Sequence, residues 1–199
     1  MILVGKEAIN FKAQAVMPDN SINPSFDLHS YAKDKICVLF FYPLDFTFVC
    51  PSEIIALNRK IAHFKEKGAE VIGISVDSHY AHLAYKNTSV NDGGIGNVQF
   101  PLVSDLDKSI AANYGILHNQ SVALRGVFVL DRNLIVQHQL VNNLSIGRNI
   151  DEILRTIDAI QYHETHGEVC PANWSKGKVA MVATPEGVAA YLAKNADFL

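Results

Sequence analysis

The stretch ICVLFF at residues 36–41 is an unbroken apolar run, typical of a central β-strand that is covered on both faces. Pro43 ends this strand, because proline lacks the N–H that a sheet ladder needs. Between residues 51 and 67, apolar residues recur every three or four positions and predict an amphipathic helix, which Gly68 stops. This part of the chain therefore predicts a buried strand, a short loop and a helix in succession.

Strands and helices alternate on either side of a second apolar run, VIGISV, at residues 71–76. The remaining pattern predicts helices at about 79–87, 107–114, 149–164 and 186–195, a hairpin of strands 127–130 and 134–136, and a loop at 88–97. This order predicts an α/β fold with a mixed central β-sheet flanked by helices. The thioredoxin-like fold is the arrangement of this kind that we expect. We divide the chain into a domain at 1–164 and a C-terminal tail at 165–199.

Composition excludes several classes of protein. The 199 residues carry a formal net charge of -3 and show no basic patch for nucleic acid. No apolar run is long enough to span a membrane, and the N-terminus lacks the features of a signal peptide. We therefore predict a cytoplasmic protein that binds neither nucleic acid nor a membrane.

The histidines offer an alternative reading as a metal site. His79 and His82 are three residues apart on a predicted helix, and His163 and His166 have the same spacing. Neither pair has cysteines or carboxylates at metal-ligand spacing in the sequence, so we interpret all four as solvated surface residues. We predict no metal and no cofactor.

The three cysteines, Cys37, Cys50 and Cys170, are too few and odd in number for a secreted disulfide framework. Cys37 lies inside an apolar strand and is interpreted as a packing residue. Cys50 begins the predicted helix, followed by Pro51. The first helical turn presents unpaired N–H groups and partial positive charge, which stabilise a thiolate. Position alone leaves two readings of Cys50 open, a reactive thiolate and a buried structural cysteine.

The residues before Cys50 favour the reactive thiolate. Pro43, Thr47 and Cys50 form the pattern P-x-x-x-T-x-x-C, with aromatic residues around the cysteine. Thr47 is close enough in sequence for its hydroxyl to meet the sulfur or an oxygen bound beside it. Pro43 can wall the site without offering a competing donor. A peroxide needs this combination of a thiolate, an orienting hydroxyl and positive charge near the oxygen that leaves.

Segment 43–53 resembles the active-site loop of the peroxiredoxins, and more narrowly that of the typical 2-Cys group, which includes the bacterial alkyl hydroperoxide reductases. The resemblance covers nearly the whole chain. It extends to segments 93–96, 124–126, 147–148 and 167–171. It implies a thiol-dependent peroxidase that reduces hydrogen peroxide and organic hydroperoxides, in antioxidant defence and redox homeostasis.

The resemblance also implies the roles of individual residues. Cys50 is the peroxidatic cysteine, which becomes sulfenic acid when it attacks the peroxide. Thr47 orients the peroxide and Pro43 shields the pocket. Arg125 stabilises the thiolate and holds the substrate oxygen, since a guanidinium stays charged and presents a rigid fork of donors.

The resemblance further implies which residues position Arg125 and which thiol reacts with the sulfenic acid. Glu53 and Arg148 position Arg125. Cys170 of a partner subunit resolves the Cys50 sulfenic acid as an intersubunit disulfide. The unit of function is then a homodimer, which we expect to assemble into a ring of five dimers, a decamer. Thioredoxin or a flavoprotein disulfide reductase supplies the electrons by thiol–disulfide exchange.

Other functions stay open at this point. A thioredoxin-type oxidoreductase needs C-x-x-C, which the sequence lacks. A ring-forming holdase chaperone is compatible with peroxidase activity. The loop at 93–96 resembles that of relatives prone to overoxidation, but Tyr191-Leu192 replaces the Tyr-Phe pair of those relatives. We therefore expect intermediate sensitivity to overoxidation.

Overall fold

The fold is built around a seven-stranded sheet in the computed structural model, which describes residues 1–198. The strands lie across the sheet in the order β2 (Ile22–Asp27), β1 (Lys12–Val16), β5 (Leu102–Ser104), β4 (Ala69–Ser75), β3 (Ile36–Phe41), β8 (Arg125–Leu130) and β9 (Val136–Asn142). A small separate sheet pairs β6 (Leu117–His118) with β7 (Val122–Ala123). β3, the strand predicted from ICVLFF, therefore lies near the middle of the main sheet.

The main sheet is mixed, as predicted. β3 runs parallel to β4 and antiparallel to β8, and β4 runs parallel to β5. All six residues of β3 are buried, which confirms that this strand is covered on both faces. Cys37 is fully buried within it, and burial raises the pKa of its thiol above the ordinary range. This confirms that Cys37 is a packing residue.

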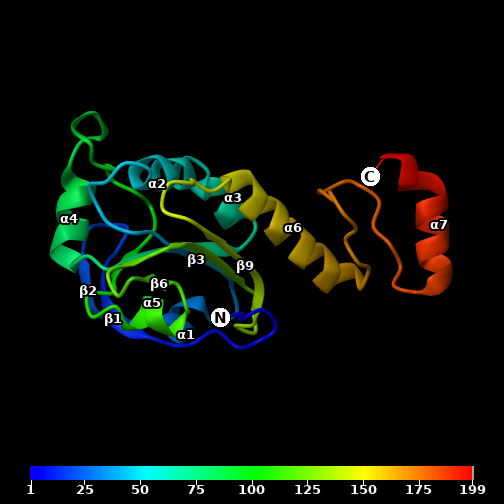
Figure 1. Ribbon diagram of the computed structural model, residues 1–199, viewed down its shortest axis with the longest axis horizontal. Helices are drawn as coiled ribbons and strands as arrows, with labels where there is room; N and C mark the ends of the chain where they lie inside the picture. The colour runs from blue at the N-terminus through cyan, green and yellow to red at the C-terminus, as the bar shows by residue number, and fades with distance from the viewer. Residues whose placement is uncertain (199) are drawn as a thin grey trace. The chain divides into compact units, whose positions relative to one another are not determined.

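Helices flank the sheet on both sides (Figure 1). α1 (Leu28–Ala32) and α5 (Ser109–Asn113) contribute to one core cluster with alternate residues of β3 and β4. α2 (Cys50–Arg59) and α3 (Ile61–Glu66) lie on the other side. α4 (His79–Asn87) packs on β1 and β5 and leads into a short helix, η1 (Val90–Asp92). The predicted α/β architecture is confirmed.

The single helix predicted at 51–67 is wrong in one respect, because the chain turns at Lys60 between α2 and α3. The Lys60 N–H bonds to the Leu57 carbonyl and the His63 N–H to the Lys60 carbonyl. These are tight three-residue steps, which interrupt an α-helix without proline or glycine. The apolar periodicity runs through the turn and does not reveal it.

Two N-terminal strands, β1 and β2, were not predicted. β2 is an edge strand of mixed composition, has half of its residues exposed, and contains Pro24. Proline is tolerated on an edge, because one side of such a strand needs no sheet hydrogen bonds. Neither strand has the uniform apolar run that identified β3.

The chain forms two compact units, Met1–Ile150 and Asp151–Leu199. The second contains α6 (Ile150–His166) for all but its first residue, α7 (Pro185–Asn195) and η2 (Ala196–Phe198). The functional division predicted at residues 164 and 165 falls inside α6 and stays a prediction. Within residues 1–198, no helix has the length and apolar character required to cross a bilayer.

Candidate active site

Cys50 is the first residue of α2 and is completely buried. Pro51 occupies the first turn, where its missing N–H leaves no bond unmade. The Ser52 hydroxyl donates to the Val49 carbonyl at 2.6 Å and fixes the entry into the helix. The predicted position of Cys50 at a helix N-terminus is therefore confirmed, and the thiol is free.

Two side chains donate toward the sulfur of Cys50. The Thr47 hydroxyl lies 3.0 Å from Sγ and 2.8 Å from the Leu44 carbonyl. Because a hydroxyl has one proton, it serves one of these acceptors at a time, and a charged thiolate is the stronger acceptor. Nη1 of Arg125 lies 3.3 Å from Sγ. The structure thus brings Thr47, Cys50 and Arg125 together from a loop, a helix and a strand.

Glu53 links Arg125 to a second guanidinium. Its Oε2 accepts from Nη1 of Arg125 at 2.8 Å and from Nη2 of Arg148 at 2.9 Å. Its Oε1 accepts from the backbone N–H and Nε of Arg148 at 2.8 and 2.9 Å. All three side chains are buried. Two cations and one anion leave a net positive charge beside the sulfur.

Each guanidinium is also held by backbone carbonyls. Nε of Arg125 donates to the Leu144 carbonyl at 2.7 Å. Nη1 of Arg148 donates to the carbonyls of Phe41 and Gly126 at 2.7 and 2.8 Å. Burial lowers the pKa of Arg148, and the bonds to Glu53 oppose that shift. Because these N–H donors are hydrogen-bonded, burying the two guanidinium groups costs only a moderate amount of folding free energy.

A pocket of about 440 Å³ opens beside this cluster. Most of its lining is apolar, and Thr47, Arg125 and Ser145 supply the polar side chains; the apolar lining residues are Pro43, Leu44, Phe48, Val49, Val122 and Leu144. Pro43 therefore lies where the sequence placed it, at the wall of the site. The pocket can admit a small polar molecule that carries an apolar substituent.

The interpretation of His79 and His82 as solvated residues is wrong. Both are buried, because α4 packs its inner face against the sheet. Nδ1 of His82 lies 2.8 Å from the Asp45 carboxylate, and Nε2 lies 3.2 Å from the Val103 carbonyl. His163 and His166 are exposed, as predicted.

Asp45, His82 and Asp77 bring possible metal-ligand atoms within 4.8 Å of one another. Hydrogen bonds already occupy these atoms, since the Asp45 carboxylate also accepts from the Tyr42 hydroxyl at 2.8 Å and Asp77 accepts from the Asp45 N–H at 2.9 Å. The cluster is thus a network that anchors the loop before Cys50. Sequence spacing did not reveal it, because its members come from separate segments.

Cys170 lies in the second unit and is partly buried, with a free thiol. Burial raises the pKa of the Cys170 thiol, and the positive charge of Arg155 lowers it. Its segment is held by a backbone bridge between Val169 and Met181 and by Nη1 of Arg155, which donates to the Trp174 carbonyl at 2.8 Å. Few direct bonds hold the sulfur, which lies 3.6 Å from the Ala159 carbonyl.

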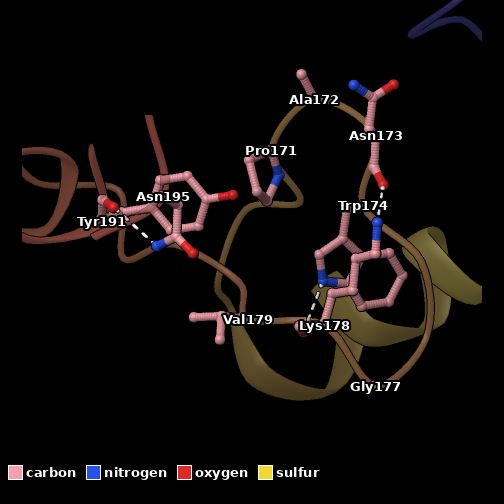
Figure 2. A pocket seen from close by; sticks show the side chains of 9 residues that line it. All are labelled: Pro171, Ala172, Asn173, Trp174, Gly177, Lys178, Val179, Tyr191 and Asn195. Carbon is pink, nitrogen blue, oxygen red and sulfur yellow. Dashed lines mark hydrogen bonds between the residues drawn. The ribbon is translucent and has the colours of Figure 1, made fainter. Parts of the chain in front are cut away.

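A second pocket, of about 310 Å³, lies among the residues that follow Cys170. Figure 2 shows the indole of Trp174 beside this pocket, with its nitrogen facing the Lys178 carbonyl at 3.1 Å. Tyr191 and Asn195 of α7 line the other side. Pro171, which directly follows Cys170, is among the described residues that line this pocket.

Comparison with known proteins gives consistent matches along the chain. The AhpC/TSA family model matches residues 4–139, and the model of the C-terminal domain of 1-Cys peroxiredoxin matches residues 159–194. Alkyl hydroperoxide reductase C of Helicobacter pylori is 50% identical over 194 residues, covering 98% of each chain. The chloroplastic 2-Cys peroxiredoxin BAS1 of Hordeum vulgare is 46% identical, covering 96% of this chain and 90% of the relative.

A solved structure extends the comparison to three dimensions. The crystal structure of reduced 2-Cys peroxiredoxin from Plasmodium vivax superimposes with a TM-score of 0.94 and is 56% identical. The superposition covers 97% of this chain and all of the other. The predicted thioredoxin-like fold is thereby confirmed.

Proposed function

Because the chain belongs to the AhpC/TSA family and is a thiol-dependent peroxidase of the peroxiredoxin type, we propose that Cys50 is the thiol that attacks the peroxide. The observation that carries this proposal is the position of its sulfur between the donors of Thr47 and Arg125, at 3.0 and 3.3 Å. Cys37 is enclosed in the core and Cys170 lacks a comparable pair of donors among the described residues.

The chemical step follows from this geometry. The Cys50 thiolate attacks one peroxide oxygen, an S–O bond forms and the O–O bond breaks. The second oxygen leaves with the electron pair, takes up a proton and departs as water or an alcohol. Thr47 orients the peroxide by its hydroxyl, and Arg125 stabilises the charge that develops on the oxygens. Glu53 and Arg148 hold Arg125 in place for this task.

The pocket supports a substrate class. Pro43 and its apolar neighbours exclude water from the sulfur, while the volume of about 440 Å³ exceeds what hydrogen peroxide requires. Hydrogen peroxide and organic hydroperoxides are therefore the proposed substrates. The proposed cellular role is antioxidant defence and redox homeostasis.

The second half of the cycle is proposed to need a second subunit. Cys170 of the partner subunit condenses with the Cys50 sulfenic acid, forming a disulfide and releasing water. The free, partly buried thiol of Cys170 and the 2-Cys names of several relatives support this step. The homodimer, the ring of five dimers and the thioredoxin or flavoprotein reductant remain predictions, as does the cytoplasmic location.

Nonreducing gel electrophoresis tests the proposal. One equivalent of peroxide is expected to produce a disulfide-linked dimer that disappears when thioredoxin and its reducing system are added. The dimer is expected to require both Cys50 and Cys170, with Cys37→Ser as the matched control that leaves it intact. A crosslinked dimer that forms without Cys50 contradicts the proposed nucleophile, and one that resists thioredoxin points to the flavoprotein reductant.

A further inference from the structure

Tyr85, on the inner face of α4, is fully buried, and its hydroxyl has no hydrogen-bond partner among residues 1–198. Burial raises the pKa of this hydroxyl above the ordinary range, and the charges of Asp45 and Cys50 add to the shift. The Phe46 backbone N–H opposes this rise in the pKa, but no hydrogen bond joins it to the hydroxyl oxygen within residues 1–198. An N–H can only donate, and the hydroxyl proton therefore still lacks an acceptor.

Tyr85 lies between two loops of the first unit. Its ring packs against the ring of Phe46, with centroids 4.6 Å apart. Its carbonyl accepts a bond from the Ile95 N–H at 3.2 Å, within the glycine-containing loop at 93–96. Phe46 has a positive φ of 52°, which is unfavourable for an aromatic residue, and its side chain is half exposed. The loop that leads to Cys50 thus covers Tyr85 in a strained conformation.

Other buried tyrosines of the same unit have paired hydroxyls. The Tyr42 hydroxyl donates to the Asp45 carboxylate at 2.8 Å, and the Tyr114 hydroxyl donates to the Ile9 carbonyl at 2.9 Å. Breaking either bond costs stability, whereas exposing the Tyr85 hydroxyl lets it regain hydrogen bonds with water. Tyr85 therefore favours a conformation in which the segment from Phe46 to Cys50 has moved away.

We propose that Tyr85 is a positioning residue that destabilises the closed form of segment 46–50 and so speeds the opening that exposes Cys50 sulfenic acid to its resolving thiol. This inference rests on the proposed function of Cys50 and Cys170. Tyr85 would affect whether the Cys50 sulfenic acid, once formed, becomes a disulfide or is oxidised further. The same residue contacts segment 46–50 and the loop at 93–96, so both loops respond to its packing.

Two reactions compete for the sulfenic acid. In the open form, the Cys170 thiol attacks the sulfenic sulfur, an S–S bond forms and water leaves. In the closed form, a second peroxide oxidises the sulfur to sulfinic acid and is itself reduced to water or an alcohol. A residue that favours opening therefore directs the enzyme toward the disulfide and limits overoxidation.

The experiment compares Tyr85→Phe with the wild-type protein after mixing with excess hydrogen peroxide, followed by acid quenching and mass spectrometry of Cys50. Losing an unpaired hydroxyl is expected to stabilise the closed form and slow disulfide formation by about 5- to 30-fold. The sulfinic fraction is expected to rise accordingly. Hydrogen exchange of the amides in segment 46–50 is expected to slow by a similar factor.

Two tyrosine variants serve as matched controls. Tyr42→Phe removes a paired hydroxyl beneath the same loop and is expected to speed amide exchange and lower the sulfinic fraction. Tyr114→Phe removes a paired hydroxyl far along the chain and is expected to leave the partition unchanged. Equal amide exchange and equal sulfinic fractions in Tyr85→Phe and wild type overturn the inference.

Disulfide formation and amide exchange distinguish the role of Tyr85 from the proposed function of Cys50 and Cys170. If Cys50 forms no sulfenic acid, or Cys170 forms no disulfide with it, the proposed function is wrong. The amide exchange of segment 46–50 still decides the effect of Tyr85 in that case, because it needs no peroxide. Normal disulfide chemistry with unchanged exchange in Tyr85→Phe overturns the role of Tyr85 alone.

Discussion

The surroundings of Cys50 and Cys170 differ in nearly every physical respect. Cys50 is completely buried, begins a helix and receives donors from Thr47 and Arg125. Cys170 is partly exposed, lies outside any helix or strand, and has a pKa raised by burial. One thiol is enclosed in a charged cluster of hydrogen-bonded side chains, and the other has a single long contact, at 3.6 Å, to the Ala159 carbonyl.

These contrasting surroundings suit the two thiols to different steps of the proposed cycle. Attack on a peroxide needs donors already placed around the developing charge, because rearranging them during the reaction adds to the barrier. Resolution needs a thiol that can reach another sulfur, so a partly exposed thiol outside any helix or strand suits it. The two regions therefore respond differently to the same kind of substitution.

The largest expected effect comes from serine at either cysteine. Cys50→Ser is expected to abolish peroxide consumption, because a hydroxyl is a far weaker nucleophile than a thiolate at neutral pH. Cys170→Ser is expected to keep the first turnover and lose the interchain disulfide. Rapid-mixing measurements with one equivalent of peroxide check both. Normal steady-state turnover in Cys50→Ser contradicts the proposed mechanism.

A pair of arginine variants tests whether the charge beside each thiol matters for peroxide attack. Arg125→Met removes a charged donor from the Cys50 sulfur and is expected to slow its oxidation by about 100- to 1000-fold. Arg155→Met, the matched change beside Cys170, is expected to leave that oxidation rate unchanged. The rate of sulfenic acid formation, followed by quenched-flow mass spectrometry, measures both. Equal rates in the two variants argue against a direct role of Arg125.

A smaller effect is expected in the pH dependence of disulfide formation by Cys170. Because burial raises the pKa of Cys170, only a minor fraction is thiolate at neutral pH. Disulfide formation is expected to rise about tenfold per pH unit below that pKa, and to keep rising beyond the pH where an ordinary thiol levels off. Arg155 lowers this pKa, so Arg155→Met is expected to move the profile to higher pH. A profile that levels off near neutral pH contradicts the assignment.

The smallest expected effect concerns the stability of the first unit. Lys86 is buried with its ammonium donating to the Met17 and Pro18 carbonyls at 2.6 and 3.3 Å, and burial lowers its pKa to about 8. The unfolded chain, with a pKa of 10.5 for this group, binds more protons between these values. The Lys86 contribution to stability therefore rises as pH increases from about 8 to about 10.5.

Denaturant unfolding of wild type and Lys86→Met measures this contribution as a difference, which removes the effects of other titrating groups. The stability of the wild type relative to the variant is expected to increase with pH across that window. If the stability difference between the two proteins does not change with pH, Lys86 has the same pKa in the folded and unfolded states. Peroxide turnover at neutral pH provides the reference for an intact active site.

Regular patterns made much of the fold predictable from the sequence. The continuous apolar run at 36–41 identified β3, and helical periodicity identified α2, α4 and α6 within a few residues. The sequence patterns did not predict elements whose structure depends on contacts with distant parts of the chain. The edge strand β2 has no distinctive composition, and the turn at Lys60 lies within a continuous periodic stretch.

The candidate site divides in the same way. Thr47 and Cys50 are three residues apart, so their meeting at a helix start followed from local geometry. Arg125 entered through a resemblance, and its bonds to the sulfur and Glu53 join residues far apart in the chain. The buried pair of Asp45 and His82 was missed, since the histidine spacing suggested a surface helix.

Local sequence patterns were enough to predict that a cysteine begins an amphipathic helix after a buried strand, with a threonine one turn before it. They also determined the α/β class, because apolar periodicity is a local property of the chain. Three-dimensional contacts were needed to identify which charges surround that cysteine, which histidines are buried and which tyrosine hydroxyl lacks a partner within residues 1–198. Those properties depend on desolvation and on contacts between distant segments, and neither is encoded in the spacing of neighbouring residues.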